Sequence, residues 1–276
     1  MHAPGGSPVP NSTRGDAARQ AVFHSAEWYD RSINWQARLE REIPLLCEVF
    51  GPPGRGGLLD AGCGTARQAV ALAERGYRVT GADSSEDMLE LARRQAANSG
   101  ADVRFVCCPY GRLTDHLEPG FDGVYCLGNS LAAAASAEGV GLAIRNFAAM
   151  LRPEGRLFVQ VLNFPPMRGQ SPCVKGPRVV TVDGIEHVSI RTYHFHPDPA
   201  AGPEGRVEVV NTTLWNDGTW RRRSRSGNLY PLTSGELIEW CRAAGLEVCE
   251  RYGAYDRTAF DPATSSDLLL IAQRTV

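Results

Sequence analysis

Two carboxylates and two glycines form the most informative pattern in this chain. Asp60 is followed by Gly62 and Gly64 directly after a short apolar run, and Asp83 lies 19 residues after Gly64, at the end of a second strand-like segment. Glycines allow a ligand to approach the backbone closely, and an acid at this distance can accept hydrogen bonds from both hydroxyls of a ribose. The pattern therefore predicts half of a nucleotide-binding α/β unit.

The residue three positions after Gly64 narrows the choice of nucleoside. A dinucleotide fingerprint has a third glycine there, because a pyrophosphate needs an open helix N-terminus, but this chain has Arg67. Asp60 places a carboxylate where a cationic amino group could lie, which suits the methionine part of S-adenosylmethionine. A glycine pair alone marks ordinary turns, so the prediction rests on the whole pattern.

Composition favours a small-molecule partner. The 276 residues carry a formal net charge of -2, with a pI of about 6.3 and a mean hydropathy of -0.25, so nothing in this balance indicates nucleic acid or a membrane surface. We expect a cytoplasmic protein, since no apolar run is long enough for a membrane span and no secretory signal opens the chain. The 8 cysteines include no Cys-x-x-Cys pair, which predicts free thiols and no metal. A homodimer is compatible with the sequence.

The segments around the glycine pattern alternate between strand-like and helical periods. This alternation predicts an α/β fold with a doubly wound, seven-stranded, mostly parallel sheet of Rossmann-like type. We expect strands near 103–107, 123–127, 156–162, 246–250 and 267–273, and helices near 85–98 and 136–151.

Other regions depart from this alternation. Residues 1–18 are rich in Gly, Pro, Ser and Asn and are expected to form a disordered tail. Residues 19–55 show helical spacing, with a break or start at Pro44, and are expected to form an N-terminal helical cap. Residues 176–230 contain strand-like segments joined by Gly-containing turns, which predicts an antiparallel lid. The cofactor-binding domain is expected to comprise 56–175 and 231–276.

The sequence resembles the class I S-adenosylmethionine-dependent methyltransferases, and within them the glycine N-methyltransferase branch. The Asp-x-Gly-x-Gly pattern with Asp83 matches the first two motifs of the superfamily. Residues 126–131 (Cys-Leu-Gly-Asn-Ser-Leu), 163–164 (Asn-Phe) and 229–231 (Leu-Tyr-Pro) resemble the branch. The likeness covers nearly all of residues 22–274, and it implies S-adenosylmethionine as cofactor and a small-molecule acceptor.

The resemblance extends the cofactor site beyond the glycine pattern. In the family, an arginine one helix ahead of the first motif holds the cofactor carboxylate, and Arg38 stands in the matching place. Met88 corresponds to a methionine that lies against the nucleoside, and Tyr110 is a candidate for stacking on the adenine. The predicted cofactor residues are Trp28, Arg38, Asp60, Gly62, Gly64, Asp83, Met88, Tyr110 and Leu127.

Departures from the family bear on the acceptor. The family's arginine for the glycine carboxylate is replaced by Leu162, and a leucine cannot satisfy a buried carboxylate, so glycine is a poor acceptor candidate. A family histidine is replaced by alanines after Leu131, which leaves room for a larger acceptor. We expect a specialised natural-product metabolite, such as a cyclic dipeptide, an alkaloid or an amino sugar. The predicted acceptor residues are Asn129, Asn163, Phe164, Trp215 and Tyr230.

The chemistry leaves the methylated atom open. A sulfonium makes its methyl group electrophilic, so alignment and exclusion of water suffice for an acceptor nitrogen. The alternative, C-methylation of an electron-rich aromatic such as an indole, would use a His or Tyr base. An alternative of another class is a non-catalytic cofactor-fold binding protein, which the intact motifs disfavour. The candidate bases are His24, Tyr29, Tyr193 and His194, each of which could instead be a packing or surface residue.

Overall fold

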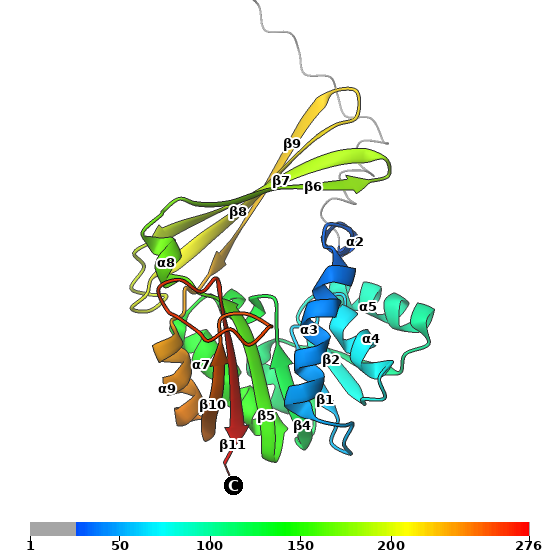
Figure 1. The fold of residues 1–276 in the computed structure, drawn as a ribbon, viewed down its shortest axis with the longest axis vertical. Helices are drawn as coiled ribbons and strands as arrows, with labels where there is room; N and C mark the ends of the chain where they lie inside the picture. The colour runs from blue at the N-terminus through cyan, green and yellow to red at the C-terminus, as the bar shows by residue number, and fades with distance from the viewer. Residues whose placement is uncertain (1–25, 276) are drawn as a thin grey trace, which may run out of the picture.

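The computed structural model describes residues 26–275, which form a seven-stranded sheet with helices on both faces and a separate four-stranded sheet that arches over one edge of it (Figure 1). The large sheet has the order β10-β11-β5-β4-β1-β2-β3, and β11 alone runs against its neighbours. The prediction of a mostly parallel, doubly wound sheet is confirmed. Its strands are β1 (Leu58–Ala61), β2 (Val79–Asp83), β3 (Val103–Cys107), β4 (Phe121–Cys126), β5 (Leu151–Leu162), β10 (Leu246–Tyr252) and β11 (Asp267–Arg274).

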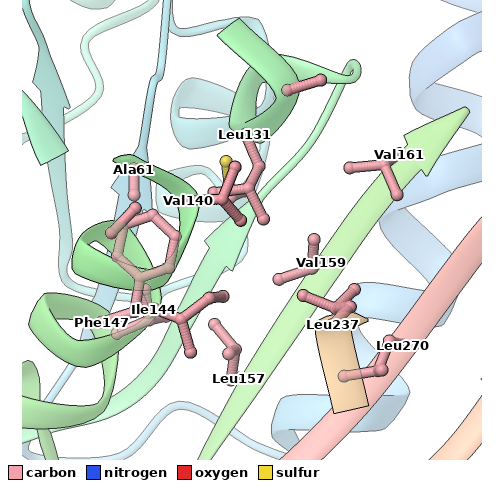
Figure 2. Close-up of a cluster of buried hydrophobic side chains, with 14 of the residues drawn as sticks. Ala61, Leu131, Val140, Ile144, Phe147, Leu157, Val159, Val161, Leu237 and Leu270 are labelled. Atoms are coloured by element: carbon pink, nitrogen blue, oxygen red, sulfur yellow. The ribbon is translucent and has the colours of Figure 1, made fainter. Parts of the chain in front are cut away.

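Two cores form because successive side chains of each strand point to opposite faces of the sheet. Leu58 packs with the helices on one face, whereas its neighbour Leu59 packs with those on the other. We call the core that contains Leu58 the first core and the one that contains Leu59 the second core. Figure 2 shows the second core, where Ile144 and Phe147 lie near Leu157. The helices of the first face are α3 (Trp35–Phe50), α4 (Arg67–Ala73) and α5 (Glu86–Ser99), and those of the second are α7 (Ala137–Met150) and α9 (Ser234–Ala243).

The smaller sheet joins the two sides of the molecule. At one end of it, Tyr193 and Val207 are buried in the second core. At the other end, the Asp183 carboxylate pairs with Arg31 of the short helix α2 (Ala26–Arg31) at 2.6 Å. The sheet therefore spans the carboxyl edge of the large sheet (Figure 1). Its strands are β6 (Cys173–Val182), β7 (Ile185–His196), β8 (Arg206–Asn216) and β9 (Trp220–Leu229), so it begins three residues before the predicted boundary at 176.

The cap differs from the sequence-based expectation at Pro44. This proline lies inside α3 and does not break it, because Ile43, Leu45 and Leu46 around it are buried. The helical cap is instead interrupted ahead of Asn34, whose Oδ1 accepts a hydrogen bond from the Ala37 amide and so begins α3. The predicted tail 1–18 lies outside the described residues.

Short elements complete the chain between the longer ones. They are η1 (Tyr110–Arg112), α6 (Leu113–His116), η2 (Ser130–Ala134) and α8 (Pro165–Arg168). Among the described residues, no helix combines the length and apolar character that crossing a membrane would require.

Candidate cofactor site

A cavity of about 240 Å³ opens at the carboxyl ends of β1 and β2. The strand order reverses here, since β1 pairs with β2 on one side and with β4 on the other, and ligands of open α/β sheets bind at such a point. The cavity is lined by seven of the nine predicted cofactor residues. They are Arg38, Asp60, Gly62, Gly64, Asp83, Met88 and Leu127.

The turn after β1 requires glycine at its first glycine position. Gly62 has φ +83°, and a Cβ there would lie 2.4 Å from the Tyr110 hydroxyl oxygen and 2.6 Å from Ser130 Oγ. A backbone hydrogen bond joins the turn to the neighbouring strand β2, because the Gly62 amide donates to the Ala82 carbonyl at 2.7 Å. The turn is therefore held tightly between β2 and the loop after β4.

Replacing Gly62 with alanine is expected to distort this turn. The positive φ and the two close contacts together should lower the free energy of unfolding by about 2 kcal/mol or more. The measurement is urea denaturation. Gly235→Ala is the control, because the nearest atom to a Cβ at that position would be Thr233 Oγ1, at 3.9 Å. Equal stability of Gly62→Ala and the wild-type protein would contradict the geometry.

Asp83 closes the other side of the turn. Its Oδ2 accepts a hydrogen bond from the Gly64 amide and its Oδ1 accepts one from the Ser85 amide, both at 2.9 Å. A carboxylate has about four lone-pair sites, so about two remain available toward the cavity. This geometry fits a ribose whose two hydroxyls donate to one carboxylate.

Asp60 places a buried carboxyl at the cavity. Its side chain lines the cavity, it is 4% exposed, and its Oδ2 has no hydrogen-bond partner among the described residues. Burial raises the pKa of Asp60 to about 8; the Tyr125 hydroxyl opposes that rise, and the Asp83 charge adds to it. An unsatisfied buried oxygen is costly, and a cationic amino group would satisfy it. This buried acceptor therefore fits the amino group of S-adenosylmethionine, which would donate to it.

Cofactor binding should release a proton from Asp60 near neutral pH. With its pKa raised above the unfolded value, the Asp60 carboxyl stabilises the free protein at low pH, and that contribution is lost as the pH rises through about 8. A cationic ligand reverses the preference, so affinity should increase between pH 6 and 8. Calorimetry in buffers of different ionisation enthalpy measures the released proton. In Asp60→Asn the release should disappear, and an unchanged release would contradict the assignment.

Arg38 reaches the cavity from α3 and is held by an acid one turn later. Its Nε donates to Glu42 Oε1 at 2.8 Å, and its guanidinium lies 5.1 Å from the centre of the Trp35 ring. Burial opposes the charged form of Arg38, but the Glu42 carboxylate more than offsets this and raises the pKa. Glu42 Oε2 also accepts from Gln68 Nε2 at 2.8 Å. The fixed guanidinium is suited to a ligand carboxylate.

Glu42 and Gln68 were missed by the sequence analysis. An acid within a helix looks the same in the sequence whether it is buried or exposed. The Arg38 and Glu42 spacing of four residues was the available signal, because such pairs meet on one helix face.

Two predicted cofactor residues lie outside the cavity lining. The Tyr110 hydroxyl contacts Ser130 Oγ at 2.6 Å, and its ring packs edge-on against Phe147 at 5.6 Å. The ring is thus in edge contact with the core, and its stacking on adenine stays a prediction. The Trp28 ring packs against His187 of the lid at 4.8 Å. It connects the cap to the lid.

The five predicted acceptor residues do not line this cavity. Asn163 Nδ2 donates to the carbonyls of Pro262 and Ser265, and Asn129 Oδ1 accepts from the Leu162 amide, so both side chains tie loops together. The remaining three are buried. They are Phe164, Trp215 and Tyr230, whose hydroxyl donates to Glu236.

The candidate bases are dispersed. Tyr29 lines the cavity, with its Cε1 4.0 Å from the Cβ position of Gly64. Tyr193 is 3% exposed and belongs to the second core, while the His194 ring contacts Thr192 Oγ1 at 3.0 Å on the other face of the strand. Neither is placed to act at the cavity, because the core and the strand's alternation direct them elsewhere. His24 lies outside the described residues.

Comparison with known proteins agrees with this site. Residues 58–155 match the family described as a methyltransferase domain. A glycine/sarcosine N-methyltransferase of Parasynechococcus marenigrum is 31% identical over 237 residues, 85% of this chain and 78% of its own. One of Aphanothece halophytica is 31% identical over 138 residues, about half of each chain (50% and 52%). The solved structure of CalS10 from Micromonospora echinaspora, an amino pentose methyltransferase bound to S-adenosylmethionine, has a TM-score of 0.68 and 22% identity, covering 98% of this chain and 100% of that chain.

Together with the match to the methyltransferase domain family, the strand order, the glycine turn and the acid at the end of β2 identify the chain as a class I S-adenosylmethionine-dependent methyltransferase. Such enzymes have many different acceptors, so the class alone leaves the substrate open. Within the class, the chain belongs to the glycine/sarcosine N-methyltransferase family.

Proposed function

We propose that this enzyme transfers a methyl group from S-adenosylmethionine to the amino nitrogen of a small specialised metabolite. The observation that carries the proposal is the convergence of Asp83, Asp60 and Arg38 on one cavity. These side chains are suited to bind the ribose hydroxyls, the amino group and the carboxylate of the cofactor. When bound, the cofactor supplies an electrophilic sulfonium methyl group. Tyr29 lies at the same cavity and helps to exclude water.

Nitrogen is favoured over carbon as the methylated atom. A neutral amine attacks without a base, whereas an aromatic carbon must lose a proton after it gains the methyl group. Two of the predicted bases, Tyr193 and His194, are engaged in the core and on the far face of the lid. The names of the two glycine/sarcosine N-methyltransferase relatives support nitrogen as well.

The acceptor is expected to be a polar amine larger than glycine. Leu162, which replaces the carboxylate-binding arginine of the family, is half-buried and packs against the second core. Tyr193 and Val207, which are buried in the second core, lie on one face of the lid. Farther along β7 and β8, the same face has two polar cross-strand pairs. These are Ser189 with Thr213, at 3.1 Å, and Arg191 with Asn211, at 2.6 Å. Between Tyr193 and the ring pair of His187 with Trp215, this face of the lid is therefore polar, which suits the hydroxyls of an amino sugar better than an indole.

A labelled-methyl assay tests this proposal. The acceptors are matched sets of amino sugars, amino acids and indole-containing dipeptides, with mass spectrometry locating the methyl group. We expect transfer to the nitrogen of an amino sugar and no transfer by the Asp83→Ala variant. Transfer to an indole carbon would contradict the proposed acceptor class while leaving the methyltransferase assignment intact. Failure of the wild-type protein to bind S-adenosylhomocysteine would contradict the cofactor site itself.

A further inference from the structure

One buried carboxylate joins the cap helix to the glycine turn. Asp30 of α2 is 6% exposed. Its Oδ1 accepts hydrogen bonds from Thr65 Oγ1 at 2.7 Å and from Arg67 Nε at 2.9 Å. Its Oδ2 accepts from Arg67 Nη2 and, at 3.2 Å, from Gln95 Nε2. The donors come from the turn after β1, from α4 and from α5, so a single side chain connects α2 to three parts of the cofactor domain.

Arg67 stands where a dinucleotide site has its third glycine. It is the first residue of α4, and a positive charge at a helix N-terminus is unfavourable because it opposes the helix dipole. The Asp30 carboxylate compensates for this charge through two contacts to the same guanidinium. Arg67 therefore binds a carboxylate of α2, and this contact attaches the cap to the glycine turn.

Two aromatic residues close to Asp30 line the cavity. Tyr29 precedes it and lies against the Gly64 position, as described above. The Asp30 carbonyl accepts a hydrogen bond from Trp35 Nε1 at 2.8 Å, and Trp35 also lines the cavity. Helix α2 has six residues, which is too short for a helix to be stable alone, so its position depends on its contacts.

We propose that Asp30 is a positioning residue for the cofactor: paired with Arg67, it holds α2 so that Tyr29 and Trp35 cover the occupied cavity. Loss of the pair weakens the attachment of α2 to the glycine turn without removing any group that touches the ligand. Cofactor should then leave faster, whereas the groups that bind it remain in place. The same contact explains why this chain has an arginine at position 67, where a dinucleotide-binding motif has its third glycine.

The test measures S-adenosylhomocysteine binding, which needs no acceptor. Calorimetry gives the Kd, and stopped-flow tryptophan fluorescence gives the dissociation rate. Asp30→Asn and Arg67→Met should each raise the Kd about tenfold, mainly through faster dissociation. Because the two residues form one contact, the double variant should lose no more than the weaker-binding single variant. Arg67→Lys, which keeps the charge, should bind more tightly than Arg67→Met.

A second ion pair made by α2, to α5 instead of α4, provides the control. Glu27 of α2 and Arg94 of α5 meet at 2.9 Å, but their side chains are 43% and 61% exposed. Exposed pairs contribute little, so Glu27→Gln should change the Kd less than about twofold. If both Glu27→Gln and Asp30→Asn weaken binding equally, the effect belongs to α2 in general and the specific role of Asp30 is wrong.

Tyr29→Ala separates positioning from folding stability. If Asp30 acts through Tyr29, adding Asp30→Asn to Tyr29→Ala should weaken binding little further. A lower Tm of Asp30→Asn with an unchanged Kd and dissociation rate would overturn the proposal, since the carboxylate would then be structural only. If Asp30→Asn does not fold, Arg67→Met and Arg67→Lys provide the same comparison from the exposed side of the contact.

Discussion

Replacing Asp83 with alanine is expected to weaken S-adenosylhomocysteine binding by about 100-fold or more. The variant loses two hydrogen bonds from the ribose to a charged acceptor, each worth about 1.5 to 3 kcal/mol. It also frees the Gly64 and Ser85 amides, which Asp83 holds at 2.9 Å, so the turn loses its shape. Calorimetry at pH 7 measures the loss directly.

Asp87 provides a matched control for this variant. It is an exposed carboxylate in the first turn of α5, close to Asp83 in the chain. Asp87→Ala changes the net charge equally but removes no residue of the cavity, so its Kd should stay within about twofold of the wild-type value. A loss of less than about fivefold in Asp83→Ala would mean that the ribose lies elsewhere.

Replacing Arg38 with methionine is expected to reduce both cofactor affinity and stability. The variant removes the guanidinium that lines the cavity and leaves the Glu42 carboxylate buried, with Gln68 at 2.8 Å and Arg41 at 3.5 Å as its remaining polar contacts in the described structure. Breaking a buried ion pair typically costs about 3 kcal/mol or more. We expect a Kd increase of about 30-fold together with a stability loss of about 2 to 3 kcal/mol in urea denaturation.

The double variant Arg38→Met with Glu42→Gln separates the two effects. The Glu42→Gln substitution replaces the buried carboxylate with a neutral amide, so most of the stability should return. The affinity should not return, because the guanidinium that binds the cofactor carboxylate is still missing. Recovery of both quantities would show that Arg38 serves stability alone, and recovery of neither would show that Glu42 has another role.

The cofactor half of the candidate site could be predicted from the sequence because its constraints are local. Gly62 occupies a tight turn with no room for a side chain, Gly64 has a φ of +54°, and Asp83 ends the next strand. Such requirements follow from backbone geometry, so they leave fixed spacings in the sequence. The alternation of strands and helices predicted the sheet for the same reason. The expected helix break at Pro44 does not occur, because tertiary burial of its neighbours outweighs the tendency of proline to interrupt a helix.

The acceptor half was not predictable in the same way. Asn163, Phe164 and Tyr230 stand in family positions, but motif register does not show whether a side chain faces a ligand or a core. Their side chains hold a loop and fill the packing between lid and sheet. Asp30 and Glu42 were missed for a related reason, because each gains its role from partners far away in the chain, such as Arg67 and Gln68.

The structure of the complex with S-adenosylhomocysteine tests the central claim most directly. We expect the ribose hydroxyls at Asp83, the amino group at Asp60 and the carboxylate at Arg38, with Tyr29 against the ligand. A ligand bound away from the cavity at the carboxyl ends of β1 and β2, or bound there without contacting Asp60 and Asp83, would contradict the account.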